Sequence, residues 1–413
     1  MSFHKYGFHV NHTGDDVLDA IRRLKPGVIK TIAHDIGFWT RVREIHPDLF
    51  LVGRLVVPQA EQERFVEDPV QVGRSFAEQI LALPANNVAP GGRPLFDAWE
   101  SFNEALPESA DPDRKRRYDA FQVAFAERLR AGGFEPVAMN FATGHFRGQD
   151  FLEHFPGTLE TYVYLGFHEY DWPDMWRLHK QNIEEQGEEG MWLCLRYRRI
   201  MDLEGVRARY GDRHTVLITE CGMTQGVVGG PDVGPWHASH PIPPERYWRS
   251  LLWYNRELML DPYVKAACLF VVGATHPWES FEHLGEILDR LVRLDQEGPD
   301  EPIPVPVDPE KEWRPPHHNR PQDPTEPTPS ELRTLLLQAG EAHQVIQFNP
   351  DAALQRRIFA DGLVPNSPEF TLEFAGQTYL CQRAEHLDTG EVRIYYVPLG
   401  LWEQIRYVHR ARE

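Results

Sequence analysis

Two glutamates, Glu104 and Glu220, each close a short apolar run that is typical of a buried strand. Glu104 ends the run Trp-Glu-Ser-Phe-Asn-Glu, and Glu220 ends the run Leu-Ile-Thr-Glu. Two carboxyl groups facing each other across a cleft are suited to cleave a glycosidic bond, because one donates a proton to the leaving oxygen while the other attacks the anomeric carbon. Repulsion between them raises the pKa of the less solvated acid, which then takes the donor role.

Other polar side chains fall at the ends of the remaining predicted strands. His168 and Tyr170 end one strand, and His276 and Trp278 follow the last. Four more residues at strand ends are candidates to contact a sugar: His9, His34, Arg54 and Asn140. For His9 and Asn140 the alternative interpretation is a rim residue whose hydrogen bonds are made inside the protein.

Two tryptophans lie in the loops where a substrate would bind. Trp172 follows the sixth predicted strand, and Trp236 lies in a long Gly- and Pro-rich loop after the seventh. Flat rings can stack on the apolar faces of pyranose sugars, and we predict this platform role for both tryptophans in preference to the alternative of packing in the core. Long loops after these strands would wall a cleft, which favours oligomeric or polymeric substrates.

These residues can meet only if the strands that carry them share one sheet. Short apolar runs alternate with amphipathic helices, a pattern that favours βαβ units and a parallel sheet. The predicted strands are Tyr6–Asn11, Val28–His34, Phe50–Leu55, Ala98–Asn103, Pro136–Asn140, Thr161–His168, Thr215–Glu220 and Ala266–Val272. Eight such units within residues 1–297 predict an α/β fold, a (β/α)8 TIM barrel, whose active site lies at the C-terminal ends of the strands. An open doubly wound sheet lacks support, because no GxGxxG or phosphate-binding loop follows a strand.

The composition changes near residue 298. Eleven of the 31 residues from Pro299 to Pro329 are proline, which predicts a semi-rigid linker over residues 298–329. Residues 330–413 then predict a small α+β module. Its predicted helices are Ser330–Ala342 and Pro350–Asp361, and its predicted strands are Glu369–Phe374, Gln377–Gln382 and Glu391–Val397. Such a module could anchor the enzyme to a glycan or a cell wall, or only add stability by docking on the barrel.

The residues at the strand ends resemble those of the large clan of retaining glycosidases that carry catalytic glutamates on strands four and seven of a barrel. The resemblance covers roughly residues 1–297 and does not assign a family within the clan. It implies that Glu104 is the acid/base, that Asn103 binds the sugar 2-hydroxyl and that Glu220 is the nucleophile. It also implies that His168 and Tyr170 orient Glu220, and that Trp278 forms the floor of a sugar subsite. Clan members usually carry an arginine near the end of strand two, where this chain has His34 and Asp35, so Arg54 on strand three is a candidate substitute.

Composition and charge narrow the classes of partner. The formal net charge of −19 disfavours binding to nucleic acid or anionic membranes and suits a neutral carbohydrate. The N-terminus lacks the apolar stretch of a secretion signal, and no run of about 18 apolar residues predicts a membrane span. The four cysteines form no CxxC pair, and we expect neither a metal nor a cofactor.

Two other classes of function remain open on the sequence alone. A metal-dependent hydrolase on the same barrel would need an HxH motif on the first strand and an aspartate on the eighth. His145 and His168 could be two of its ligands, but the first strand reads His-Val-Asn-His and the eighth ends without an aspartate. The second alternative is a non-catalytic carbohydrate-binding protein that uses the barrel as a scaffold.

Overall fold

The computed structural model describes residues 3–178, 190–225, 233–237 and 241–299, followed by 353–361, 363–367, 369–374, 377–386, 392–398 and 404–409. The chain divides into two compact units, one built from residues 1–225 and 233–305 and the other from residues 226–232 and 306–413. Most of the predicted linker and the predicted helix Ser330–Ala342 lie outside the described residues, so the domain boundaries stay predictions.

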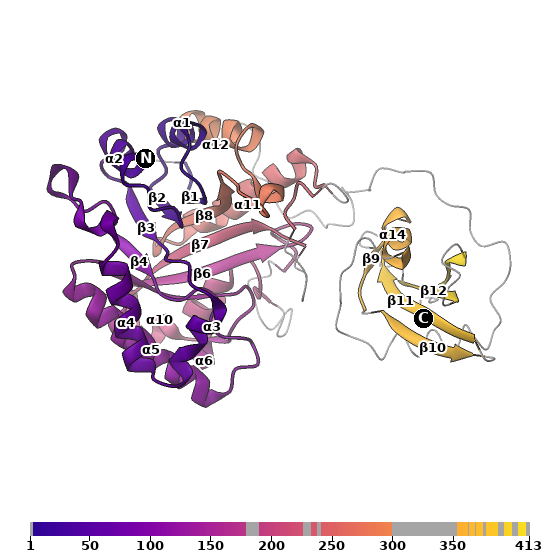
Figure 1. The fold of residues 1–413 in the computed structure, drawn as a ribbon. Coiled ribbons are helices and arrows are strands. Elements are labelled where there is room, and N and C mark those ends of the chain that lie inside the picture. Colours follow the sequence, from indigo (N-terminus) through magenta and orange to yellow (C-terminus); the bar gives the residue numbers. More distant parts are fainter. Residues whose placement is uncertain are drawn as a thin grey trace. The chain divides into compact units, whose positions relative to one another are not determined.

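The first unit is a closed barrel of eight parallel strands in sequence order (Figure 1). Because β1 pairs with β2 on one side and with β8 on the other, no strand is left at an edge. The strands are β1 Tyr6–Val10, β2 Val28–Thr31, β3 Phe50–Gly53, β4 Ala98–Glu100, β5 Glu135–Phe141, β6 Tyr164–Asp171, β7 Thr215–Met223 and β8 Val264–Val272. The predicted (β/α)8 barrel is confirmed.

Helices surround the barrel and bury their apolar faces against it. The longer ones are α1 Asp15–Leu24, α2 Ile36–Ile45, α4 Pro69–Leu81, α5 Pro112–Ala131, α11 Pro244–Leu260 and α12 Glu286–Glu297. Shorter helices are α3 Gln59–Gln62, α6 Gly148–His154, α7 Pro156–Thr161, α9 Arg196–Arg198 and α10 Val206–Tyr210. In α1 the buried residues Val17, Ile21 and Leu24 recur with the helical period, so one stripe faces the core. No helix in the described part of the chain is both long and apolar enough to cross a membrane.

The second unit contains a five-stranded antiparallel sheet and a helix. Strands β10 Phe370–Phe374, β11 Gln377–Glu385, β12 Val392–Pro398 and β13 Arg406–His409 follow one another, and β9 Val364–Pro365 pairs with β11. Helix α14, Ala353–Ala360, contributes Leu354 and Ile358 to a cluster with Tyr395 and Val397 of the sheet. A small α+β module was predicted here, and only the short strands β9 and β13 were not foreseen.

Candidate active site

The interior of the barrel is built in layers along its strands. A lower layer is apolar and includes Val28 on β2, Ala98 on β4 and Cys268 on β8. Side chains two residues apart on a strand point to the same face, so the next layer toward the C-terminal ends receives Lys30 on β2 and Glu100 on β4. Both are completely buried. A charged layer therefore lies on an apolar floor, beneath the ends of the strands.

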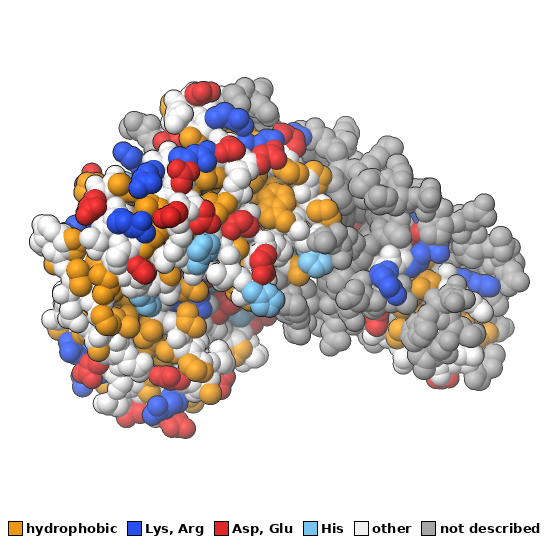
Figure 2. Space-filling view, turned by 45° about the horizontal axis from the view of Figure 1, so that its top comes forward, with side chains coloured by type: hydrophobic (Ala, Val, Ile, Leu, Met, Phe, Trp, Pro, Cys, Tyr) orange, Lys and Arg blue, Asp and Glu red, His pale blue; other side chains and the backbone are white. Residues whose placement is uncertain are grey.

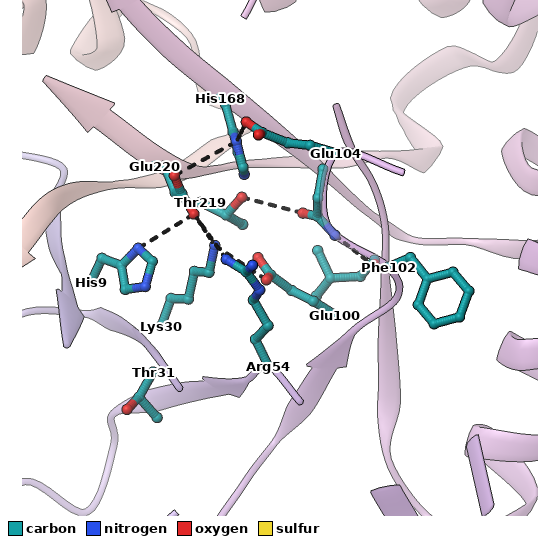
Figure 3. A network of polar contacts seen from close by, with 12 residues as sticks. His9, Lys30, Thr31, Arg54, Glu100, Phe102, Glu104, His168, Thr219 and Glu220 are labelled. Atoms are coloured by element: carbon teal, nitrogen blue, oxygen red, sulfur yellow. Dashed lines mark hydrogen bonds and ion pairs between the residues drawn. The ribbon is translucent and has the colours of Figure 1, made fainter. Parts of the chain in front are cut away.

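Glu220 on β7 is held at both carboxylate oxygens (Figure 3). Its Oε1 accepts a hydrogen bond from Lys30 Nζ at 2.8 Å, and Arg54 Nη1 and His9 Nδ1 lie 3.4 and 3.6 Å from the same atom. Its Oε2 accepts a hydrogen bond from the Tyr170 hydroxyl at 3.1 Å. The two oxygens thus differ, because cations gather at Oε1 while Oε2 faces the side chains of β6.

Opposite charges keep Glu220 ionised although it is buried. Burial alone would raise the pKa of Glu220, but His168, Lys30 and Arg54 outweigh burial and hold this pKa well below its usual range. Burial, together with the charge of Lys30, places the pKa of His9 well below its usual range, so its imidazole is neutral near pH 7. Glu220 is therefore a carboxylate surrounded by hydrogen-bond donors and positive charge.

Glu104 lies in the loop after β4, and its side chain is 42 % exposed. Its φ of 50° is in the left-handed region, which is uncommon for a residue with a side chain. The backbone N–H of Glu104 donates to the carbonyl of Asn140 on β5, which supports this turn. The turn directs the carboxyl group to His168, whose Nδ1 is 2.7 Å from Glu104 Oε1.

His168 connects the two glutamates (Figure 3). Its completely buried ring has Nδ1 at 2.7 Å from Glu104 Oε1 and 3.7 Å from Glu220 Oε2. These two oxygens are therefore at most about 6.4 Å apart, the sum of 2.7 and 3.7 Å. Glu104 and Glu220 thus come from opposite parts of the barrel to one place at its C-terminal end.

The degree of solvation of the two acids is the reverse of what their predicted roles required. The less solvated acid was expected to be the proton donor, yet the side chain of Glu220 is 9 % exposed and that of Glu104 is 42 % exposed. Burial is not decisive here, because the cations around Glu220 overcome it. Glu104 has no ion pair with Lys or Arg in the described part of the chain, so the distribution of positive charge, rather than of solvent, distinguishes the two acids.

Of the other residues predicted to contact a sugar, Asn103 and Trp278 lie near the two glutamates or the residues around them. Asn103 Oδ1, beside Glu104, is buried and accepts no hydrogen bond from the described residues. The Trp278 ring packs against Phe270 at 5.3 Å between centroids, and Phe270 in turn packs against His9 at 4.9 Å. Trp278 is thus linked to the group around Glu220 through one aromatic ring.

Three of the predicted contacts are engaged elsewhere. Asn140 is fully buried, and its Oδ1 accepts a hydrogen bond from the hydroxyl of Thr219 at 3.2 Å, so its amide serves the barrel interior. His34 lies beyond the end of β2 with Nε2 3.1 Å from the carbonyl oxygen of Arg54. His276 is 89 % exposed and pairs with Glu279 on the surface. We therefore leave Asn140, His34 and His276 out of the site.

Neither Trp172 nor Trp236 is brought to the two glutamates by a described contact. Trp172 is half-buried against the core of the barrel. Trp236 donates from Nε1 to the carbonyl of Glu282 at 2.6 Å and packs edge-on against Tyr247. Core packing, the alternative to the predicted platform role, accounts for these contacts.

Lys30 was not anticipated from the sequence, although a signal for it exists. It stands inside the apolar run Val-Ile-Lys-Thr, and lysine is almost never fully buried unless it is paired. A buried strand with one lysine therefore requires a carboxylate across the barrel. Glu100, which had no visible partner in the sequence, is 3.2 Å from Lys30 Nζ.

Glu169 on β6 points away from this layer and has a structural role. It accepts hydrogen bonds from the backbone N–H groups of Leu195 and Tyr197 and from the Tyr254 hydroxyl. Burial outweighs these bonds and raises its pKa to about 7. Within the described ranges no group of three or more His, Cys, Asp or Glu side chains is arranged to hold a metal ion. His145 Nδ1 instead contacts the carbonyl of Leu106 at 3.2 Å.

No family model and no curated protein matches the chain. Solved structures do match. A family 51 α-L-arabinofuranosidase from Bifidobacterium longum is 11 % identical, with 72 % of this chain and 73 % of that protein covered and a TM-score of 0.45. A family GH2 β-galacturonidase from Eisenbergiella tayi is 14 % identical over 71 % of this chain and 51 % of its own length, with a TM-score of 0.44. A family GH128 endo-β-1,3-glucanase from Pseudomonas viridiflava is 12 % identical over 70 % and 96 %, with a TM-score of 0.41.

These three solved structures are glycoside hydrolases. The chain spans about half the length of the galacturonidase. At identities of 14 % or less the likeness concerns the fold only, and the roles of individual residues rest on the site geometry.

Proposed function

We propose that this chain is a retaining glycoside hydrolase in which Glu220 is the nucleophile and Glu104 the acid/base. The observation that carries the proposal is the pair of carboxyl groups on either side of His168 Nδ1, at 2.7 and 3.7 Å. Retaining enzymes place their carboxyl groups about 5–5.5 Å apart, and inverting enzymes about 6.5–9.5 Å apart, to admit a water molecule. The upper limit of about 6.4 Å between the nearest oxygens, from 2.7 plus 3.7 Å, favours retention.

In the first step Glu220 Oε2 attacks the anomeric carbon, and the bond from that carbon to the leaving oxygen breaks. Glu104 transfers its proton to the leaving oxygen. Oε2 is the atom suited to attack, because Oε1 already accepts from Lys30 and faces Arg54 and His9. Tyr170 holds Oε2 until attack begins.

In the second step Glu104 acts as a base and removes a proton from water, which attacks the same carbon and releases Glu220 as a carboxylate. Cations at Oε1 stabilise the charge that returns to Glu220, so the carboxylate leaves readily. The hydrogen bond between His168 Nδ1 and Glu104 Oε1 keeps the acid/base within reach in both steps.

A carbohydrate substrate follows from this chemistry, and we propose a neutral oligo- or polysaccharide. Asn103 supplies a buried oxygen that can accept a hydrogen bond from a sugar hydroxyl. The ring of Trp278 is held in place by its contact with Phe270 and offers a flat surface on which a sugar can stack.

The test is a screen of aryl glycosides and polysaccharides, with proton NMR of the first-formed anomer. We expect retention of configuration. Glu104→Ala should lower kcat by about 10²–10⁴-fold, and azide should restore turnover of substrates whose leaving group needs no proton, as a glycosyl azide of retained configuration. Glu220→Gln should abolish turnover. An inverted first product would exclude the covalent intermediate, and turnover with both glutamates replaced would exclude the mechanism.

Glycan anchoring by the second unit is a separate proposal. Full-length protein and a chain ending at residue 299 would be compared for retention on insoluble polysaccharides. Equal retention of the two would remove the anchoring role, whatever the activity of the barrel.

A further inference from the structure

Beneath Glu220 lies an ion pair whose deeper member, Glu100, takes no part in the mechanism above. Lys30 and Glu100 are both completely buried, and Lys30 Nζ is 3.2 Å from Glu100 Oε2. The same nitrogen is 2.8 Å from Glu220 Oε1. Lys30 thus bridges two carboxylates, one that would react with substrate and one that lies deeper in the barrel (Figure 3).

Stability does not explain why this pair exists. Taking two charges out of water costs several kcal/mol per ion, and replacing a buried ion pair by apolar residues is often neutral or stabilising. Neither oxygen of Glu100 takes a hydrogen bond from a described residue, so Glu100 is not compensated in the way that Glu169 is. An apolar side chain at this level would continue the layer formed by Val28, Ala98 and Cys268.

The number of positive and negative charges in the site suggests a function for Glu100. In the resting state two cations, Lys30 and Arg54, face two carboxylates, Glu100 and Glu220. When Glu220 becomes an ester it loses its charge. Without Glu100, the completely buried Lys30 and the partly buried Arg54 would then have neither of these two carboxylates to balance their charge.

We propose that Glu100 is a positioning residue that acts through Lys30, sharing this cation with Glu220 in the resting site and retaining it while Glu220 is esterified. The proposal rests on the retaining mechanism proposed above. As the bond from Oε2 to the anomeric carbon forms, the ammonium group of Lys30 follows the remaining negative charge toward Glu100. No proton leaves Lys30, and the proton for the leaving group still comes from Glu104.

Two consequences follow for Glu220. If Lys30 were devoted to Glu220 alone, the carboxylate would be a weaker nucleophile, because its charge would be held more tightly. It would also be a better leaving group, for the same reason. Glu100 therefore speeds formation of the intermediate and does not speed its breakdown.

Several charged or titratable groups face Glu220 and contribute to any pH dependence. These groups lie on seven of the eight strands or directly after them. In chain order they are His9, Lys30, Arg54, Glu100, Glu104, His168, Tyr170, Cys221 and Cys268. Among the described residues, Lys30 is the one that forms an ion pair with both Glu100 and Glu220. Changes at Lys30 and Glu100 should therefore move Glu220 in opposite directions.

The first test is kinetic. In Glu100→Gln, kcat on substrates with poor leaving groups should fall at least tenfold (about 1.4 kcal/mol), because formation of the intermediate limits their turnover. On activated aryl glycosides, whose turnover is limited by breakdown of the intermediate, kcat should be unchanged or higher. An equal loss on both substrate classes would show a general structural defect and overturn the proposal, as would no loss on either class.

The second test does not need activity. The titration of Glu220 would be followed by NMR of protein carrying ¹³C at the glutamate side-chain carboxyls, with the signal assigned by its absence in Glu220→Gln. Lys30→Met should raise the pKa of Glu220 by at least one unit, and Lys30→Arg should restore it toward the wild-type value. In Glu100→Gln, Glu220 should titrate no higher than in wild type. An unmoved signal in Lys30→Met, or a raised pKa in Glu100→Gln, would overturn the proposal.

A matched control removes another buried carboxylate. Glu169→Gln should change thermal stability while leaving the titration of Glu220 and the leaving-group dependence as in wild type. The NMR arm also separates the two proposals. Wild-type protein without glycosidase activity would refute the proposed function, whereas the coupling of Glu100, Lys30 and Glu220 would still be decided by the titration.

Discussion

Two identical functional groups acquire different properties from the residues around them. Glu220 is surrounded by Lys30, Arg54 and His9 at one oxygen, whereas Glu104 is half open to solvent and contacts His168. Because the pKa of Glu220 is held well below its usual range, Glu220 is a carboxylate near neutral pH. The positive charge around Glu220 therefore supports its proposed role as nucleophile, and the greater exposure of Glu104 suits its proposed role as acid/base.

Tyr170 offers a prediction at the residue scale. Its hydroxyl donates to Glu220 Oε2, and a hydrogen bond to a charged group contributes about 1.5–3 kcal/mol. Tyr170→Phe should therefore lower kcat/KM by about 10–100-fold, with KM changing less than kcat, because Tyr170 contacts Glu220, the proposed nucleophile. Steady-state kinetics measure this. Tyr162→Phe, which removes a buried hydroxyl bonded to Gln122, is the control and should affect stability only.

Glu169 offers a second residue-scale prediction, on stability. Its pKa of about 7 in the folded protein exceeds its ordinary value of 4.5. Between these two values the folded protein holds a proton that the unfolded chain releases, so the free energy of unfolding falls as pH rises. The loss is on the order of 3 kcal/mol across this range. Glu169→Gln lacks this loss, and denaturant unfolding at pH 5 and pH 7.5 should show wild type losing more stability than the variant. Parallel losses would contradict it.

At the scale of elements, strand ends decide which predicted residues reach the site. All eight barrel strands could be found from alternating apolar runs and helices, because each run is short and buried. The exact ends of the strands could not be predicted, because a strand ends where its pairing with the neighbouring strands stops, and this pairing is not visible in the strand's own sequence. Strand β2 ends at Thr31, three residues before its predicted end, so His34 lies in the loop beyond the strand. Strand β4 ends at Glu100, and Glu104 reaches His168 only through a loop with left-handed backbone.

Buried polar groups were equally hard to foresee from the sequence. Lys30 lies inside its predicted strand rather than at its end, and the alternation of β2 carries it into the barrel interior beside Glu100. Asn140 is a candidate for substrate binding because it ends a predicted strand. In the structure its amide oxygen instead accepts a hydrogen bond from the hydroxyl of Thr219 on β7. Contacts across the barrel join residues far apart in sequence, so no local pattern reveals them.

Gly166 on β6 gives a prediction at this scale. A Cβ placed there would overlap Asn140 Oδ1 and lie 3.1 Å from the carbonyl oxygen of Ala138. Gly166→Ala should therefore displace Asn140 from Thr219 and reduce stability by about 2–4 kcal/mol, from overpacking and the lost hydrogen bond. Denaturant unfolding followed by tryptophan fluorescence measures this. Gly27→Ala, whose Cβ meets no atom within 4 Å, is the control, and equal stability of the two variants would contradict the packing account.

At the scale of the whole molecule, the formal net charge is −19. Figure 2 shows acidic and basic side chains mixed on the face of the barrel that it displays. Surface pairs such as Arg290 with Glu286 and Arg117 with Asp113 account for some of this mixing. A mixed surface of this kind suits the neutral substrate that we propose better than a polyanion.

The division into two units gives the prediction at this scale. Every residue of the proposed site lies between His9 and Trp278, within the barrel. A chain ending at residue 299 should therefore keep kcat/KM on small aryl glycosides within about a factor of three of the full-length value. Circular dichroism melts of both proteins would confirm that the shortened chain is folded. A folded but inactive barrel would show that the C-terminal unit contributes to catalysis.

The closure of the barrel by β1 and β8 also has a consequence for synthesis on the ribosome. Tyr6 pairs with Ala267, and at about 5–20 residues per second a ribosome needs roughly 13–50 s to make the chain between them. During that time β1 has a free edge, and such edges invite pairing with other chains. Lys30 and Glu100 are both made well before Glu220. The nascent sheet therefore already contains a carboxylate for its buried lysine long before Glu220 emerges.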